Sequence, residues 1–199
     1  MSSTEDIAPI TVHRAQRADA RRNHERVLAA AREAFAEGGE STALEEIARR
    51  AGVGIGTLYR HFPNRQALLE ALYVNEVDEI CSAAKLDAAD PWEALNDWFE
   101  RLIGYLAAKR ALAHELLNYL DADAPLFKQC RAGLFAAGEP LLKRAQDAGV
   151  VRSDVGFSDV LHMVGGITKM PASEPGQVEH VLRVALDGLR YRPEPPANA

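Results

Sequence analysis

Cysteine and long apolar runs are both scarce in this sequence of 199 residues. The two cysteines, Cys81 and Cys130, lie far apart and outside any Cys-x-x-Cys pattern, so we expect neither a disulfide scaffold nor a zinc ribbon. Uninterrupted apolar stretches reach only a few residues, and we therefore expect no membrane-spanning helix and no signal-peptide core. Together the two absences favour a cytoplasmic protein.

Sequence signatures of catalysis are missing as well. The chain has no Gly-x-Ser-x-Gly, no Walker loop and no Gly-x-Gly-x-x-Gly after a strand, the patterns that position a nucleophile or bind nucleotide phosphates. Its six histidines and two cysteines never approach the spacing of metal ligands. We therefore expect no enzymatic activity, no cofactor and no metal site.

Charge is distributed unevenly along the chain, although the totals are ordinary. Apolar residues make up 47% and charged residues 26% of the sequence, as in typical globular proteins. Residues 1–65 contain ten arginines, no lysine and nine acidic residues, a net charge of +1, whereas residues 66–199 contain thirteen basic and twenty acidic residues, a net charge of −7. An arginine-rich head on an acidic body is typical of a protein that presents one end to a polyanion.

Apolar residues recur at three- and four-residue steps along most of the chain, and no stretch alternates like a strand, which predicts an all-α fold. Helices are expected at residues 19–38, 43–50 and 55–61, then from 65, from 91, at 125–148, at 157–170 and at 174–191. The predicted domains are a three-helix head at 19–65 and a helical bundle at 66–191. The ends at 1–18 and 192–199 lack an apolar period, and we expect a flexible arm and a disordered tail there.

The head has the spacing of a helix-turn-helix. Thr42 is followed three residues later by Glu45, the pattern of a capping box that begins the second helix. Gly52 and Gly54 supply a tight turn into the third helix. The outer face of that helix is expected to carry Thr57, Tyr59, Arg60 and His61. All four can donate hydrogen bonds to base edges or phosphates, which predicts a DNA-binding domain.

The stretch from Ile47 to Phe62, IARRAGVGIGTLYRHF, resembles the DNA-binding signature of the tetracycline-repressor (TetR) family. That signature reads roughly I-A-x-x-A-G-V-S-x-G-x-L-Y-x-[HY]-F, with a basic residue three positions on, which Arg65 matches. The resemblance covers about residues 20–75. It implies a ligand-responsive transcriptional regulator, a repressor that binds a palindromic operator as a homodimer and is released by a small-molecule effector.

The resemblance also implies DNA contacts at particular positions of the head. Arg60 is expected to read a base edge, while Thr42, His61 and Arg65 are expected to hold phosphates. The full set is Thr42, Gly54, Gly56, Thr57, Tyr59, Arg60, His61 and Arg65. Gly54 stands where the family usually has serine, and Ile55 replaces a frequently polar residue. An isoleucine there either contacts a thymine methyl or packs, and the sequence leaves both open.

The body is expected to bind the effector and to form the dimer. The candidate pocket residues are Trp98, Leu102, Tyr105, His114, Phe127 and Phe135. Each of these types is more often a core residue than a pocket residue, so both interpretations stay open. The predicted dimer interface consists of Val160, Leu161, Val164, Ile167, Val181, Leu182, Ala185 and Leu189.

One alternative function remains at this point. A protein could keep the helix-turn-helix scaffold and act through protein contacts instead of DNA. The two hypotheses differ in salt dependence, because binding through phosphate contacts weakens steeply as salt rises.

Overall fold

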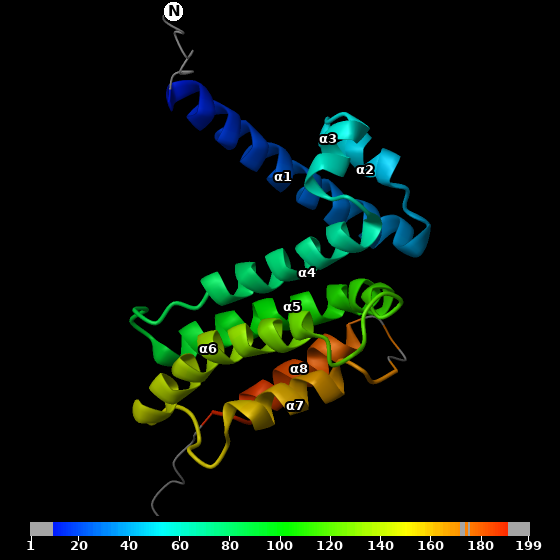
Figure 1. Cartoon of the computed structure of the whole chain (residues 1–199). Coiled ribbons are helices and arrows are strands. Elements are labelled where there is room, and N and C mark those ends of the chain that lie inside the picture. The colour runs from blue at the N-terminus through cyan, green and yellow to red at the C-terminus, as the bar shows by residue number, and fades with distance from the viewer. Residues whose placement is uncertain (1–9, 172–173, 175, 191–199) are drawn as a thin grey trace, which may run out of the picture. The chain divides into compact units, whose positions relative to one another are not determined.

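The computed structural model describes residues 10–171, 174 and 176–190, and helices form most of this part of the chain. They are α1 (Ile10–Gly38), the 3-10 turn η1 (Gly39–Ser41), α2 (Leu44–Ala51), α3 (Ile55–His61), α4 (Arg65–Ser82), α5 (Pro91–Leu116), α6 (Pro125–Asp147), α7 (Phe157–Ile167) and α8 (Gln177–Asp187) (Figure 1). Within the described ranges the one extended pairing is an isolated bridge between Val151 and Arg190. The all-α prediction is confirmed. None of the described helices has the length and apolar character needed to span a bilayer.

The chain folds as two compact units, one that ends at Leu72 and one that begins at Tyr73. The division falls inside α4, so this helix contributes residues to both units. The domain boundaries expected from the sequence stay a prediction, and the predicted tail at 192–199 lies outside the described residues.

α1 begins at Ile10, well before the start at Asp19 that the sequence suggested. The prediction of a flexible arm is therefore wrong for residues 10–18. That prediction rested on the missing apolar period, but the period reports what a helix packs against and not whether a helix forms. The segment contains no glycine and no proline, and it is rich in alanine and arginine, which are good helix formers.

The first unit is built by packing α1 against α2, and α2 against α3. α2 and α3 have only eight and seven residues, too few for a stable helix in isolation. Their stability comes from apolar side chains buried against α1 and the start of α4. These side chains are Val27, Leu28, Ala31, Ala34, Phe35, Ile47, Ala48, Ala51, Leu58, Phe62, Leu68, Leu69 and Leu72.

The second unit has an aromatic core. The rings of Trp98, Phe99 and Phe135 each lie near the ring of Phe157, with centroids 5.8, 6.4 and 5.2 Å away. A side chain at Gly138 would collide with Phe157 and Trp98, so glycine there allows α6 to approach this cluster closely. The Trp98 indole N–H also donates to the backbone carbonyl of Ile80 at 3.0 Å, which ties α5 to α4.

Candidate nucleic-acid interface

α3 has one buried face and one exposed face. Leu58 is completely buried, and Phe62, directly after the helix, is 2% exposed, so these two side chains anchor α3. The other face carries Ile55, Gly56, Thr57, Tyr59, Arg60 and His61, of which Thr57 and His61 are half-buried and the others exposed. Tyr59 is 44% exposed, so it is not a core residue. The structure thus places every predicted contact residue of the third helix outside the core.

The orientation of α3 depends on the turn at Gly52. This residue ends α2 with a left-handed backbone, at φ 62°. The amide of Val53 donates to the carbonyl of Ala48 at 3.0 Å, which closes the turn. Arg26, on α1, donates to the carbonyl of Gly52 at 3.2 Å. The sequence gives no signal for this role, because Arg26 is one of a row of arginines and its partner is 26 residues away.

His24 is a second residue of α1 that supports the interface. Its ring centroid lies 4.9 Å from that of Phe62 and 5.9 Å from that of His61. Burial lowers the pKa of His24, and the neighbouring His61 lowers it further, while Glu25 acts in the opposite direction. Compared with a histidine in water, His24 beside the end of α3 therefore favours its neutral form over its charged form. No motif in the sequence marks this position.

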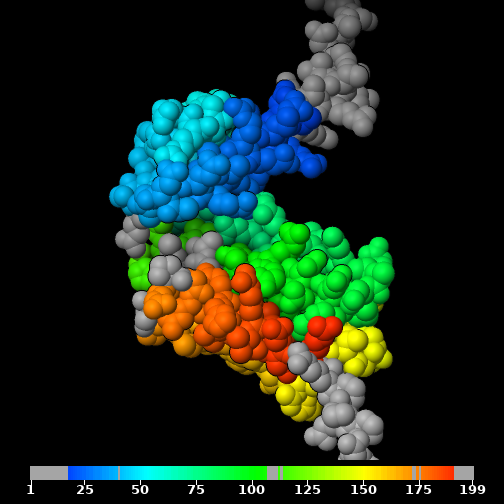
Figure 2. Space-filling view, turned by 180° about the vertical axis from the view of Figure 1, so that it is seen from behind, coloured from blue at the N-terminus to red at the C-terminus, as the bar shows by residue number. Residues whose placement is uncertain are grey.

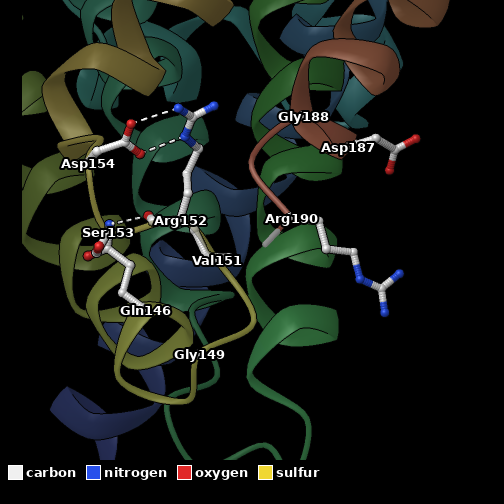
Figure 3. A pocket seen from close by; sticks show the side chains of 9 residues that line it. All are labelled: Gln146, Gly149, Val151, Arg152, Ser153, Asp154, Asp187, Gly188 and Arg190. Atoms are coloured by element: carbon white, nitrogen blue, oxygen red, sulfur yellow. Dashed lines mark hydrogen bonds and ion pairs between the residues drawn. The ribbon is translucent and has the colours of Figure 1, made fainter. Parts of the chain in front are cut away.

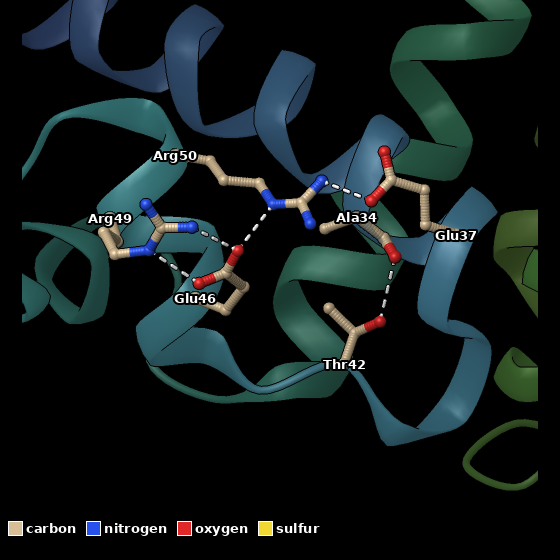
Figure 4. A network of polar contacts seen from close by, with 6 residues as sticks. All are labelled: Ala34, Glu37, Thr42, Glu46, Arg49 and Arg50. Atoms are coloured by element: carbon tan, nitrogen blue, oxygen red, sulfur yellow. Dashed lines mark hydrogen bonds and ion pairs between the residues drawn. The ribbon is translucent and has the colours of Figure 1, made fainter.

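Thr42 does not form the capping box that the sequence predicted. The N-cap of α2 is Ala43, and no side chain caps it. The Thr42 hydroxyl instead donates to the backbone carbonyl of Ala34 at 3.0 Å, and the residue is 8% exposed (Figure 4). The chain enters α2 through η1, which turns Thr42 back onto the end of α1. Its hydroxyl is therefore engaged inside the first unit.

Arg65 is also turned toward the first unit. Its guanidinium donates to the backbone carbonyl of Thr42 and, at 3.5 Å, to that of Gly39. The same group lies 4.8 Å from the centre of the Phe35 ring, a cation–π distance. Arg65 thus joins the start of α4 to the end of α1. The phosphate contacts expected for Thr42 and Arg65 rest on the family resemblance, and this geometry gives them a positioning role.

The arginines of α2 are held by carboxylates. Glu46 accepts two hydrogen bonds of 2.7 Å from Arg49 and one of 2.8 Å from Arg50 (Figure 4). Arg50 also pairs with Glu37 of α1 at 2.8 Å. The hydrogen bonds from Arg49 and Arg50 lower the pKa of Glu46 to about 2. By contrast, no hydrogen bond or ion pair ties the exposed Arg60 to another described residue, so its guanidinium is available to a partner.

The pocket residues predicted for the body fall into different environments. Trp98 and Leu102 are buried in the core, and Tyr105 is 9% exposed. Phe127 and Phe135 are half-buried, and His114 is exposed. Burial alone does not assign the six to one cavity, and their role in effector binding stays a prediction.

A buried pair of tyrosines joins α4 to α5 in the second unit. Burial is the main cause that raises the pKa of both Tyr73 and Tyr105, and the neighbouring Tyr73 raises the pKa of Tyr105 further. The ring of Phe127, from α6, packs edge-on against Tyr73 with centroids 5.3 Å apart. Tyr73 was not among the predicted residues, although its position in the apolar stripe of α4 marks it as buried.

A surface pocket of about 700 Å³ lies elsewhere in the second unit (Figure 3). It is lined by Gln146, Gly149, Val151, Arg152, Ser153, Asp154, Asp187, Gly188 and Arg190. The Arg152 guanidinium donates two hydrogen bonds of 2.6 Å to the Asp154 carboxylate. The Gln146 side-chain amide donates to the backbone carbonyl of Arg152 at 3.0 Å. None of the six predicted pocket residues lines it.

Comparison with known proteins accounts for both halves of the chain. The family model of bacterial regulatory proteins, tetR family, matches residues 27–72, and the model of the transcriptional regulator SbtR-like, C-terminal domain, matches residues 90–191. The crystal structure of a TetR transcriptional regulator from Streptomyces coelicolor is similar, with a TM-score of 0.73 and 40% identity, over 87% of this chain and 99% of that one. The chain belongs to the TetR family of transcriptional regulators. The resemblance found in the helix-turn-helix is thereby confirmed.

Curated relatives of this TetR-family regulator include a transcriptional repressor. The HTH-type transcriptional repressor KstR from Mycobacterium tuberculosis is 29% identical over 156 residues, 71% of this chain and 70% of KstR. The Transposon Tn10 TetC protein from Escherichia coli is 31% identical over 86 residues, 42% of this chain; the match spans 44% of TetC. Transcription regulation through DNA binding, predicted from the third helix, is therefore supported by the family.

Proposed function

We propose that this TetR-family regulator is a repressor that binds a palindromic operator as a homodimer and leaves it when a small molecule binds the body. The observation that supports the proposal best is the outer face of α3, where Arg60 and Tyr59 are exposed on a helix anchored by Leu58. A short helix of this kind reads few base pairs. Two copies related by a two-fold axis would read two half-sites about one helical turn apart or more.

The head residues then divide into two roles. Thr57, Tyr59, Arg60 and His61 contact DNA, and Arg60 reads a base edge, since arginine to guanine is the commonest specific contact. Thr42 and Arg65 position the helices, because their polar groups are engaged with the end of α1. Removing the first group would abolish binding directly. Removing the second would act through the geometry of α2 and α4.

The homodimer is proposed to form through α7 and α8, which pack against one another in the second unit. Figure 2 shows α8, in orange and red, at the surface of this unit. Half of the predicted interface residues cannot contact a second copy, because they are buried inside the protomer. These are Val160, Val164, Leu182 and Leu189. The other four, Leu161, Ile167, Val181 and Ala185, are half-buried, and Val184 beside them is 58% exposed. A side chain at Gly165 or Gly166 would meet no described atom within 4 Å, which leaves room for a second copy to approach closely.

The effector is proposed to act through α4, the helix that contributes residues to both units. A small molecule in the body would shift the tilt of α4 and with it the spacing of the two recognition helices. This requires that the effector bind one conformation more tightly than the other. The candidate contacts remain Trp98, Leu102, Tyr105, His114, Phe127 and Phe135, which the geometry does not single out.

Alanine variants of the exposed face test the proposal. Arg60→Ala and Tyr59→Ala are each expected to abolish specific binding to an enriched operator duplex, measured by fluorescence anisotropy. Light scattering should find the dimer intact, because both side chains are exposed and far in sequence from α7 and α8. Arg152→Ala, which removes an exposed arginine of the second unit, serves as the matched control and should bind normally. Undiminished operator binding by both head variants would contradict the assignment.

A further inference from the structure

Gly54 and Gly56 stand on the exposed side of the helix-turn-helix where the fold itself does not require glycine. Gly54 has φ −68° and ψ 146°, and neither glycine has a positive φ. A Cβ added at either position would meet no described atom within 4 Å. Gly56 lies within the helix, where glycine is otherwise unfavourable. The missing side chains are therefore explained better by something outside the chain that comes close to α3.

Ile55 lies between these two glycines and is exposed. Its exposed fraction is 38%, and that of Tyr59, one turn further along the same face, is 44%. α3 has only seven residues, yet it carries two large, exposed apolar side chains. Contact with another apolar group removes an exposed isoleucine from water, which lowers the free energy of the complex. Ile55 is therefore not a core residue, which favours the first of the two earlier alternatives, contact with a thymine methyl.

The neighbours of Ile55 favour a nucleic acid as the apolar partner. Arg60 is also exposed on α3, and a purely apolar protein surface would leave its charge without a partner. In the major groove of DNA, the apolar group on a base edge is the 5-methyl of thymine. Isoleucine is short, so it reaches that methyl only if the backbone of α3 comes close to the base edges. Glycine at positions 54 and 56 permits that approach.

We propose that Ile55 selects a thymine in each operator half-site through apolar contact with its 5-methyl group, and that Gly54 and Gly56 admit the α3 backbone closely enough for the contact. The inference rests on the proposed function, because it concerns the same face of α3. It adds a sequence preference that the polar residues of the helix do not supply.

The test removes the methyl group and keeps the base. Operator duplexes enriched by selection are synthesised with deoxyuridine in place of one thymine at a time, which preserves base pairing. At one position per half-site, the wild-type protein should lose about fourfold in affinity, the value of one buried methyl-sized group. Ile55→Ala should bind the unmodified duplex more weakly and should no longer distinguish thymine from deoxyuridine there, which completes a double-mutant cycle.

Two further variants control the interpretation. Val74→Ala truncates an apolar side chain of nearly equal exposure, 37%, in the second unit, and should keep both affinity and methyl sensitivity. Gly56→Ala adds a methyl group that meets no described atom of the protein, so it should retain thermal stability while it lowers operator affinity. Unchanged affinity of Gly56→Ala would contradict the close approach of α3.

The outcomes separate this inference from the proposed function. Equal binding of thymine and deoxyuridine duplexes at every position would overturn the role of Ile55 and leave operator binding intact. Full methyl sensitivity in Ile55→Ala would overturn it as well, because another group would then read the methyl. A selection that enriches no duplex would refute the proposed function, and the inference would fall with it.

Discussion

Replacing Gly52 by alanine should destabilise the helix-turn-helix through two effects that can be separated. Gly52 has φ 62°, and a left-handed conformation costs an alanine about 1–2 kcal/mol. The new Cβ would also lie 2.5 Å from Nη2 of Arg26, well inside van der Waals contact. The arginine would have to move and give up its 3.2 Å hydrogen bond to the Gly52 carbonyl, a loss of about 1 kcal/mol.

The sum of the two effects is a loss of about 2–3 kcal/mol in the free energy of unfolding. Urea unfolding of the full chain, followed by circular dichroism at 222 nm, measures this loss from helix content. Tryptophan fluorescence would miss it, because Trp92 and Trp98 both belong to the second unit. In an Arg26→Ala background, Gly52→Ala should cost only the conformational part, about 1–2 kcal/mol.

The control is Gly56→Ala, which makes the same chemical change at a glycine with an ordinary φ and open surroundings. It should be neutral or slightly stabilising, since alanine is the better helix former. A Gly52→Ala variant as stable as the wild type, within about 0.5 kcal/mol, would refute the role assigned to this turn. Equal losses for the two variants would refute it too.

Three other predictions concern charge, pH and assembly. Glu46→Gln should strengthen non-specific DNA binding. The slope of log affinity against log salt concentration should steepen by about one for each arginine freed to reach a phosphate. Glu45→Gln, which removes a charge from an exposed residue of the same helix, should change neither the affinity nor the slope. The pKa of His24 is lowered in the folded state from 6.5, so the unfolded chain binds the proton more tightly. The free energy of unfolding should therefore fall as the pH drops below about 6.5. His24→Gln should weaken this pH dependence, which urea unfolding at several pH values measures. Val184→Glu places a charge on a side chain that is 58% exposed; it should leave the protomer folded and weaken the dimer, which light scattering over a range of concentrations measures.

Local sequence patterns predicted the helix-turn-helix closely because its signals are local. α3 begins at Ile55 and ends at His61, the expected bounds, since a glycine turn precedes it and Phe62-Pro63 follows. Asn64 caps α4 as expected, accepting from the amide of Ala67 at 2.8 Å. Each of these features depends on residues within a few positions of one another.

Interactions between distant residues were not predictable in the same way. Thr42 carries the sequence pattern of a helix cap, yet its hydroxyl donates a hydrogen bond to the backbone carbonyl of Ala34, eight residues earlier. Arg65 matches a DNA-contact position of the family, yet its guanidinium lies over Phe35 and reaches back to η1. A pattern states which groups are present, but only the packing of α1 against the other helices decides which partner each polar group finds.

The body shows the same limit more strongly. Aromatic and polar residues on helical faces fit a core and a ligand site equally well, and the structure places Trp98 and Leu102 in the core. The apolar stripes of α7 and α8 likewise contain both residues that fill the protomer and residues that remain outside. Val164 and Val184 illustrate the difference, at 0% and 58% exposed.

Operator binding is best tested by selecting bound duplexes from a random pool and titrating the enriched sequence with salt. We expect a palindromic sequence whose affinity falls steeply with salt, because each phosphate contact releases counterions. A folded dimer that enriches no sequence, before and after refolding to remove any effector carried through purification, would contradict operator binding and favour a protein that acts through protein contacts.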